Sequence, residues 1–348
     1  MPTWKKILVE GDDIPASDVT AGALGTGSYD IDGALAVDTI NEHTSGQGVA
    51  VDGLLIKDGA LVGFPLLLNL LVNGGFEIWQ RGTSFSGAAD GTYTADRWQV
   101  GKGGTSTINV DRESTTKKAN SQYSLKVAYT HNAASSIKQD LKIADGYHHL
   151  LGQKVSLRIP VYANTASAVR VGITTDGTGG TTTYSSYHAG NSAWADLSIN
   201  GVTIPSDATY VRISVHLEAS CTAYVDNAML VPCTFAQDYW PLTPAEEWAR
   251  CERYYEPHAG GTSTLPFVNS YAAAVGENKM SHVLFHTRKA IVPTMTKNGT
   301  WAVLNCAQPT VQRGDVHGYV LVALSTAAGQ LDATPNSSDD TITAEANV

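Results

Sequence analysis

The sequence predicts a mainly β protein that contains an antiparallel β-sandwich, a smaller C-terminal β-domain with one helix, and an assembly-dependent N-terminal segment. Three observations support this fold class. Short segments that alternate polar and apolar residues recur between turns rich in Gly and Asn. Only 16% of the residues are charged, against roughly a quarter in typical soluble domains, and Ser, Thr, Gly and Asn take their place. One clear helix start lies near residue 243.

The length of the chain predicts several domains, because 348 residues are too many for one ordinary core. The N-terminal segment, 1–63, offers only brief strands between Gly or Asp-Gly turns. Alone it buries too little apolar area to offset the entropy lost on ordering. We therefore expect it to pack on copies of itself or on a larger assembly. The sandwich is predicted over 64–242 and the C-terminal domain over 243–348.

Strands of the sandwich are indicated by period-two alternation. In 210–217, aliphatic side chains alternate with Arg, Ser and His, so we expect one face of this strand to be buried and the other to be exposed to solvent. The Gly- and Asn-rich turns between such segments favour an antiparallel sandwich. The predicted strands are 124–129, 154–162, 168–173, 210–217 and 223–231.

The C-terminal domain begins with a helix signal. The Thr-Pro-Ala-Glu sequence at 243–246 supplies a capping hydroxyl, a proline at the first helical position and a glutamate three residues after the cap. We expect the helix to place Trp248, Cys251 and Tyr255 on roughly one face and to end before Pro257. Further strands are predicted at 280–288, 301–306, 318–324 and 341–346.

Charge and hydropathy narrow the range of partners. The formal net charge is −10, from 23 Lys and Arg against 33 Asp and Glu. This balance repels phosphate groups, so we expect neither nucleic acid nor an anionic membrane surface as a partner. The most apolar run, 61–72, contains Pro65 and Asn69 and is shorter than the ~20 residues that a membrane span needs. No signal-peptide pattern develops, so we expect a soluble protein made in a cytoplasm.

The four cysteines form no CxxC pair, and their spacing matches no zinc site. We expect buried free thiols, because a cytoplasm is reducing. A disulfide between Cys221 and Cys233 across neighbouring strands is the alternative.

Three motifs resemble strands of carbohydrate-binding modules with a jelly-roll fold. They are the segments 69–77 (NLLVNGGFE), 121–127 (SQYSLKV) and 224–230 (YVDNAML). The resemblance implies that the predicted sandwich is a jelly roll.

Other motifs resemble tail-fibre and virion proteins of tailed bacteriophages. The segments 78–85 (IWQRGTSF) and 93–98 (YTADRW) look like the form of the module found in those proteins. The segments 246–255 (EEWARCERYY) and 342–346 (ITAEA) are similar to the C-terminal domain that follows it there, and 41–59 resembles an N-terminal motif of the same proteins. Their order along one chain implies a phage fibre or spike subunit, located in the virion and assembled in the host cytoplasm.

The resemblance to carbohydrate-binding modules also implies a structural calcium ion near the edge of the sandwich. In that family the glutamate of the Gly-Phe-Glu motif and an aspartate of the last strand contribute ligands, and the matching positions are Glu77 and Asp226. Ca²⁺ takes about six to eight oxygen ligands and mixes carboxylates with backbone carbonyls. The alternative is that both acids are surface or hydrogen-bonded edge residues.

A polar stretch rich in Gly, Thr and Ser carries the candidate sugar-binding rings. Sugars stack their apolar faces on aromatic rings, while polar side chains recognise the hydroxyl groups. Rings in a sandwich are more often core, and we predict a core position for Trp79, Trp98 and Trp240. The candidate glycan-binding residues are Tyr184, Tyr187, Trp194 and Asn191.

Two histidine pairs are expected to face solvent rather than to bind metal. His148 and His149 are neighbours, whereas His282 and His286 lie on a predicted strand. Residues i and i+4 of a strand share a face but are ~13 Å apart, so one metal ion cannot bridge them.

We expect no enzymatic activity. The sequence has no Gly-x-Ser-x-Gly elbow, and the glycine-rich stretch 176–180 lacks the Gly-Lys-Ser/Thr ending of a phosphate-binding loop. No long repeat of the β-helix type appears. A glycan depolymerase is still an alternative, because its two carboxylates would meet only in the folded chain.

Three functional hypotheses follow. The first is a homotrimeric receptor-binding fibre or spike, joined to other virion proteins by its N-terminal segment, whose weak sites for host-surface glycan gain avidity from repetition. The second is a head or tail decoration protein without a ligand, and the third is the depolymerase. An open groove lined by aromatic rings favours the first and its absence the second. Two carboxylates about 5–10 Å apart in a cleft favour the third.

Overall fold

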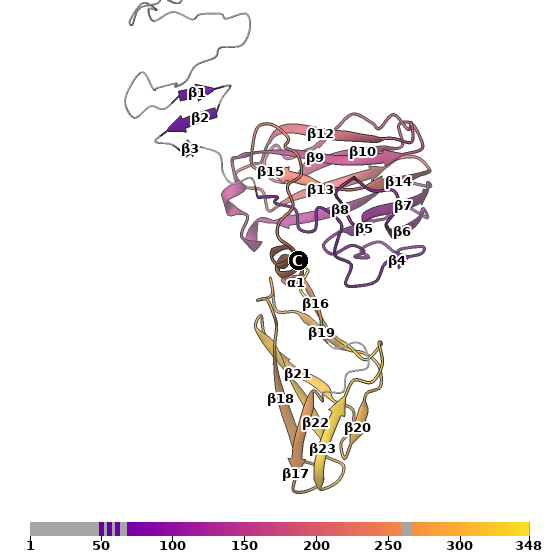
Figure 1. The fold of residues 1–348 in the computed structure, drawn as a ribbon, viewed down its shortest axis with the longest axis vertical. Helices are drawn as coiled ribbons and strands as arrows, with labels where there is room; N and C mark the ends of the chain where they lie inside the picture. Colours follow the sequence, from indigo (N-terminus) through magenta and orange to yellow (C-terminus); the bar gives the residue numbers. More distant parts are fainter. Residues whose placement is uncertain (1–48, 52–53, 58–59, 63–67, 259–265, 348) are drawn as a thin grey trace, which may run out of the picture. The chain divides into compact units, whose positions relative to one another are not determined.

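The structure is a computed structural model and describes residues 49–51, 54–57, 60–62, 68–258 and 266–347 (Figure 1). These residues form two compact units, divided after residue 65. The first unit contains the antiparallel strands β1 (Val49–Val51), β2 (Leu54–Lys57) and β3 (Ala60–Val62), in that order. They agree with the brief strands predicted here. The rest of 1–63, with its predicted role in assembly, lies outside the described residues.

The second unit begins with a jelly-roll sandwich of two antiparallel sheets, as predicted. One sheet has five strands, in the order β11 (Thr182–Tyr184), β10 (Val169–Thr175), β13 (Tyr210–Leu217), β8 (Ser135–Lys142) and β5 (Gln99–Gly101). Short 3₁₀ helices, η2 (Ile143–Asp145) and η3 (His148–Leu150), follow β8.

The other sheet has seven strands. Six follow the order β12 (Trp194–Thr203), β9 (Lys154–Ala163), β14 (Cys221–Val225), β7 (Ser124–Thr130), β6 (Thr107–Glu113) and β4 (Ser84–Phe85). The seventh, β15 (Met229–Val231), also pairs with β9. The predicted strand 223–231 is therefore two strands. It breaks at Asp226 and at Asn227, whose φ of 51° does not fit a strand.

The core of the sandwich lies between the two sheets and is built by the predicted alternation. In β13 the aliphatic positions are fully buried, whereas Arg212 and His216 on the opposite face are only half-buried. Trp98 and Phe76 add a ring pair with centroids 4.8 Å apart, and Trp79 is also buried. These positions confirm the core prediction for Trp79 and Trp98.

The prediction that Trp240 is core is wrong, because 77% of this residue is exposed. Trp240 lies in the connection between β15 and the helix α1, and the ring that turns inward there is the neighbouring Tyr239. A Cβ atom built on Gly75 would lie 2.7 Å from the Tyr239 hydroxyl, so the Tyr239 ring packs closely over this glycine.

In the residues that the structure describes, the C-terminal domain contains α1 (Pro244–Glu252) and three antiparallel three-stranded sheets (Figure 1). The first sheet is β16 (Tyr255–His258), β24 (Ile342–Glu345) and β19 (Thr294–Lys297). The second is β17 (Val268–Ala272), β23 (Gly329–Thr334) and β20 (Ala302–Leu304). The third is β18 (Asn278–Leu284), β22 (Gly318–Leu324) and β21 (Thr310–Gly314). Trp301, Tyr319 and Leu331 belong to the core of this domain.

The helix has the predicted capping box: the Thr243 hydroxyl accepts from the Glu246 amide, and the Glu246 carboxylate accepts from the Thr243 amide. The predicted face is wrong in part. Cys251 is buried, but Trp248 is 45% exposed, and Tyr255 already belongs to β16. The helix ends at Glu252 because the chain changes to strand geometry before Pro257.

Motifs that are far apart in the sequence meet where the C-terminal domain contacts the sandwich. The Arg81 guanidinium lies over the Tyr255 ring, 3.6 Å from its centroid, and 2.8 Å from the Glu345 carboxylate. Arg97 lies over the Tyr254 ring at 3.8 Å and binds Asn347 at 2.7 Å. The segments 78–85, 93–98, 246–255 and 342–346 thus share one structural role, as the two sides of a junction.

The four cysteines are free, and three of them are buried, while Cys233 is half-buried. This confirms free thiols over the alternative Cys221–Cys233 disulfide. Among the described residues, no helix has the length and apolar character that a membrane crossing requires.

Candidate functional site

A groove of about 620 Å³ runs over the outer face of the five-stranded sheet. In β10, β13 and β8 of this sheet, every second side chain is buried in the core. The side chains between them point to the outer face and form the floor of the groove. Three strand-crossing rows of paired residues supply this floor. They are Arg170–His216–Ser136–Gly101, Tyr184–Gly172–Ser214–Lys138 and Thr182–Thr174–Arg212.

Arg170 organises one end of the groove. Its guanidinium lies over the rings of Tyr184 and Tyr187, 3.7 and 4.7 Å from their centroids. Glu218 fixes the guanidinium through an ion pair of 2.6 Å and accepts a hydrogen bond of 3.1 Å from the Tyr187 hydroxyl. Both tyrosines are 39% exposed. The arrangement therefore presents two held aromatic rings to solvent, which is what an apolar sugar face requires.

The groove floor beneath Tyr184 depends on a glycine. Tyr184 and His216 pack edge to face with centroids 4.9 Å apart, and Gly172 lies between their strands. A Cβ atom on Gly172 would lie 3.0 Å from His216 Nε2 and 3.3 Å from the Tyr184 ring. Burial lowers the pKa of His216, so the imidazole is neutral at neutral pH and can act as both donor and acceptor.

The structure brings Tyr184 and Tyr187 together but places the other two candidates elsewhere. Trp194 begins β12 in the seven-stranded sheet and continues a row of rings through Tyr162 to Tyr224, with centroid separations of 6.0 and 5.3 Å. Asn191 is exposed in the loop before β12. In the described chain neither residue lines the groove. The expected single cluster is thus two groups on different sheets, because the loop after β11 carries the chain from one sheet to the other.

Glu77 and Asp226 both reach the loop 117–123. The turn before Glu77 is held by Asn73, whose side-chain amide donates to the Ile78 carbonyl at 2.8 Å and whose side-chain oxygen accepts from the Ile78 amide at 3.1 Å. Glu77 accepts the Gln122 amide at 2.7 Å, and Asp226 accepts the Lys118 amide at 2.8 Å. The two carboxylates therefore lie on one side of the sandwich and hold the same loop.

Each of these two carboxylates keeps a buried oxygen, Glu77 Oε2 and Asp226 Oδ1, that has no hydrogen-bond partner among the described residues. Asp226 is fully buried, and this burial, strengthened by the charge of Glu77, raises its pKa to about 6. A buried oxygen atom without a donor is costly unless a cation binds it. The pair therefore fits a hard cation such as Ca²⁺, which prefers carboxylate and carbonyl oxygens.

Sequence reasoning missed the polar residues that fix the rings, chiefly Arg170, His216 and Glu218. The sequence pattern did indicate two of them, because Arg170 and His216 occupy the solvent-facing positions of strands with alternating polarity. Residue spacing alone could not predict that these positions share one face of a sheet. Nor could it predict that Tyr184 would join them from β11.

Comparison with known proteins gives only structural neighbours. No family model matches the chain, and no curated protein matches it. Among solved structures, it is similar to the C-terminal family 22 carbohydrate-binding module of Clostridium thermocellum Xyn10B, at 16% identity over 45% of this chain and 99% of that chain, with a TM-score of 0.32. A family 4 module is similar at 18% identity over 46% and 97%, with a TM-score of 0.32. The family 11 module of Clostridium thermocellum, solved with a mixed-linked tetrasaccharide, is similar at 14% identity over 44% and 98%, with a TM-score of 0.30. What this chain binds is therefore inferred from its own groove.

Proposed function

We propose that this chain is a glycan-binding subunit of a phage fibre or spike and that the groove over the five-stranded sheet is its binding site. The observation that carries the proposal is the pair of exposed rings held by Arg170, of which Tyr184 lines the groove and Tyr187 lies next to it. A sugar stacks on the exposed ring surface, while the charged and hydroxyl-bearing side chains of the floor bind its hydroxyl groups.

The groove also favours a ligand over the alternative of a decoration protein that binds nothing. Its floor combines two cations that are already paired, Arg170 with Glu218 and Arg212 with Asp140, the latter through bonds of 2.6 and 2.7 Å. Lys102 and Lys138 add further positive charge to the groove lining. The groove therefore suits a hydroxyl-rich ligand that is neutral or acidic.

The virion role is proposed on sequence grounds. The motifs at 78–85, 93–98, 246–255 and 342–346 resemble phage virion proteins, and their contacts in one junction explain why they occur together. We propose a homotrimer that joins other virion proteins through 1–63. Three copies of a weak site would then bind a bacterial surface by avidity.

We also propose that Glu77 and Asp226 hold a structural calcium ion. The ion would neutralise the buried carboxylate of Asp226 and the half-buried one of Glu77. It would also fix the loop 117–123, which both residues already hold through its backbone amides. Within the same loop, the Lys117 ammonium donates to the Ser121 carbonyl at 2.5 Å.

The proposed function is not enzymatic. The acids that line the groove are engaged with neighbours: Glu218 with Arg170 and Tyr187, and Asp90 with the Lys102 amide at 2.9 Å. Glycoside hydrolysis needs one carboxyl group that is free to donate a proton and a second placed across the bond.

Binding to purified host-surface polysaccharide, measured by surface plasmon resonance, tests the groove. We expect Tyr184→Ala to weaken binding of a short oligosaccharide from this polysaccharide by about two- to twelvefold, because a ring contact contributes about 0.5–1.5 kcal/mol. The matched control is Tyr271→Ala, which removes an exposed ring (69%) from the C-terminal domain. Equal binding of both variants and the wild type would reject the groove as the site.

Two further measurements test the virion role. Sedimentation equilibrium should give three times the mass of the chain, and antibody labelling in electron micrographs should place the subunit on an appendage of the intact particle. A monomer, or labelling absent from particles, would contradict this part of the proposal.

A further inference from the structure

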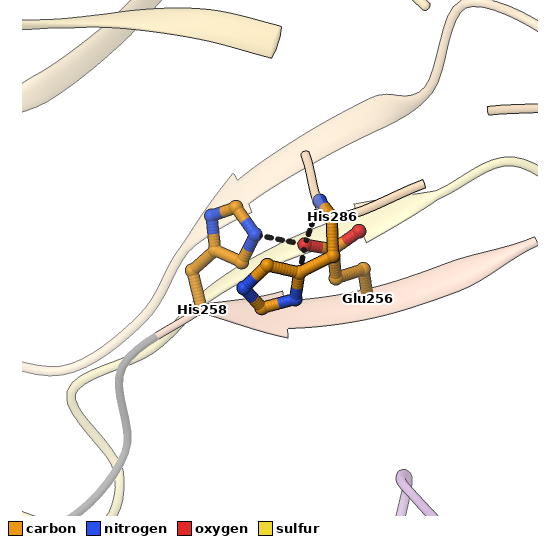
Figure 2. Close-up of side chains that lie close together, drawn as sticks. All are labelled: Glu256, His258 and His286. Carbon is orange, nitrogen blue, oxygen red and sulfur yellow. Dashed lines mark hydrogen bonds and ion pairs between the residues drawn. The ribbon is translucent and has the colours of Figure 1, made fainter. Parts of the chain in front are cut away.

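A second cluster of chemistry-bearing side chains lies in the C-terminal domain, away from the groove. Glu256 and His258 are two residues apart on β16, so their side chains share one face of the strand. His286 follows the end of β18 and turns back toward them (Figure 2). Glu256 and His258 are almost fully buried, whereas the His286 side chain is 71% exposed. The cluster thus has a buried side and a side open to solvent.

Three atoms that could bind a metal ion lie close together in this cluster. One carboxylate oxygen of Glu256 and one ring nitrogen from each histidine lie within 4.8 Å of one another. Glu256 Oε1 is 3.2 Å from His286 Nδ1 and also contacts His258 Nε2. Atoms that share one Zn²⁺ lie about 2 Å from the ion, hence roughly 3–3.5 Å apart. Small side-chain shifts are enough to admit an ion.

Neighbouring groups orient each of the three side chains. The Tyr319 hydroxyl lies 3.0 Å from His258 Nδ1, which leaves Nε2 to face Glu256. The His286 amide donates to Glu256 Oε1 at 3.0 Å. Lys289, fully buried, pairs with the other carboxylate oxygen, Oε2. Outer partners of this kind fix the orientation of metal ligands in known sites.

Charge balance in the cluster depends on a second acid. An ion beside the Lys289 ammonium needs more negative charge than Glu256 alone supplies. Glu252, at the end of α1, places a carboxylate oxygen 3.3 Å from His286 Nδ1. Two imidazoles with two carboxylates favour a borderline transition metal over Ca²⁺ or Mg²⁺, which prefer oxygen alone.

We propose that Glu256, His258 and His286 bind a divalent transition metal ion such as Zn²⁺, with Glu252 as the fourth donor. The ion ties β16 and the end of α1 to the segment that follows β18. It therefore stabilises the part of the C-terminal domain nearest its junction with the sandwich. This site is independent of the groove.

Zinc titration of chelator-treated full-length protein by calorimetry tests the site, with His286→Ala as the main variant. His286 is exposed, so its replacement should leave the fold intact. The matched control is His282→Ala, an exposed histidine four residues earlier that is outside the cluster. We expect His286→Ala to lose one tight zinc equivalent and His282→Ala to keep it. Tyr319→Phe should weaken zinc affinity by about 10- to 100-fold, because it removes only the hydroxyl that orients His258.

Cobalt replaces zinc as a spectroscopic probe that separates this site from the free cysteines. We expect Co²⁺ bands typical of four nitrogen and oxygen ligands, absent in His286→Ala, without a thiolate charge-transfer band. Equal zinc binding by the wild type and His286→Ala would overturn the proposal. So would a thiolate band, which would assign the metal to cysteine.

Discussion

The sandwich and the C-terminal domain both bury acidic side chains, but they surround them differently. In the sandwich, Asp226 is fully buried beside Glu77, and burial raises its pKa to about 6. In the C-terminal domain, Glu256 is equally inaccessible. Burial also tends to raise its pKa, but hydrogen bonds from His258, Lys289 and the His286 amide outweigh this effect and lower the pKa to about 2.

The two domains differ in whether the chain itself supplies a cation for the buried carboxylates. Glu256 has its cation within the chain, because Lys289 is buried with it. Asp226 and Glu77 share no such partner, and each keeps a buried oxygen without a donor in the described part of the chain. The Glu256 carboxylate therefore has a charge partner even before the proposed metal ion binds. The charges of Glu77 and Asp226 are expected to be balanced only when a cation binds.

Replacing Lys289 with Met should give the largest effect on this comparison. The substitution leaves the buried Glu256 carboxylate without its cation, which typically costs about 3–5 kcal/mol. We expect the free energy of unfolding of the C-terminal domain to fall by that amount, measured in urea by NMR signals from each domain. A loss below about 1 kcal/mol would mean that Glu256 does not depend on Lys289.

The two domains should also respond oppositely to acid. Asp226 binds a proton more tightly in the folded state, so the metal-free sandwich gains stability as the pH falls from about 6 to about 4. The gain has an upper limit on the order of 3 kcal/mol. Glu256 binds its proton more weakly when folded, so the stability it provides is present above pH 4.5 and is lost as the pH falls toward 2.

Urea unfolding at several pH values, read separately for each domain, checks this divergence. Asp226→Asn should flatten the pH dependence of the sandwich in part. Asp96, whose pKa burial raises to about 6 despite Arg81 at 3.7 Å, supplies the remainder. If Asp226→Asn left the pH profile unchanged, the buried proton would have to be assigned elsewhere.

Calcium binding should offset the loss of stability that the unpaired carboxylates of Glu77 and Asp226 cause in the sandwich. At 100 times its dissociation constant, an ion that binds only the folded state adds about 2.7 kcal/mol. We expect Ca²⁺ to raise the melting temperature of the wild type and of Asp96→Asn, but not of Asp226→Asn. Differential scanning calorimetry with and without chelator measures this. The same melting temperature in both conditions would rule out the calcium site.

The smallest effect is expected at a partly exposed ion pair in the C-terminal domain. Lys279 and Glu277 are 2.6 Å apart, with side chains 23% and 33% exposed. Solvent screens such pairs, so Lys279→Met should cost less than about 1 kcal/mol. The comparison with Lys289→Met isolates burial as the cause, and an equal loss in both variants would contradict that explanation.

Local sequence patterns were enough to predict the fold class and much of the core. Alternation in β13 fixed which side chains are buried, and the Thr-Pro-Ala-Glu signal fixed the start of α1. Both patterns are local: a strand has period two wherever it lies, and a cap is satisfied within one turn. The same locality let the sequence identify Tyr184, Tyr187, Glu77 and Asp226 as individual candidates.

Which of these residues meet depends on how the strands pack in three dimensions. Trp194 lies ten residues from Tyr184, yet it belongs to the other sheet, whereas Arg170 and His216 come from separate strands to hold the Tyr184 ring. His286 was not expected to share a metal ion with His282. In the structure it lies beside Glu256 and His258 of β16, which are 30 and 28 residues earlier in the sequence. Strand order and register are set by packing over the whole chain, and no local pattern encodes them.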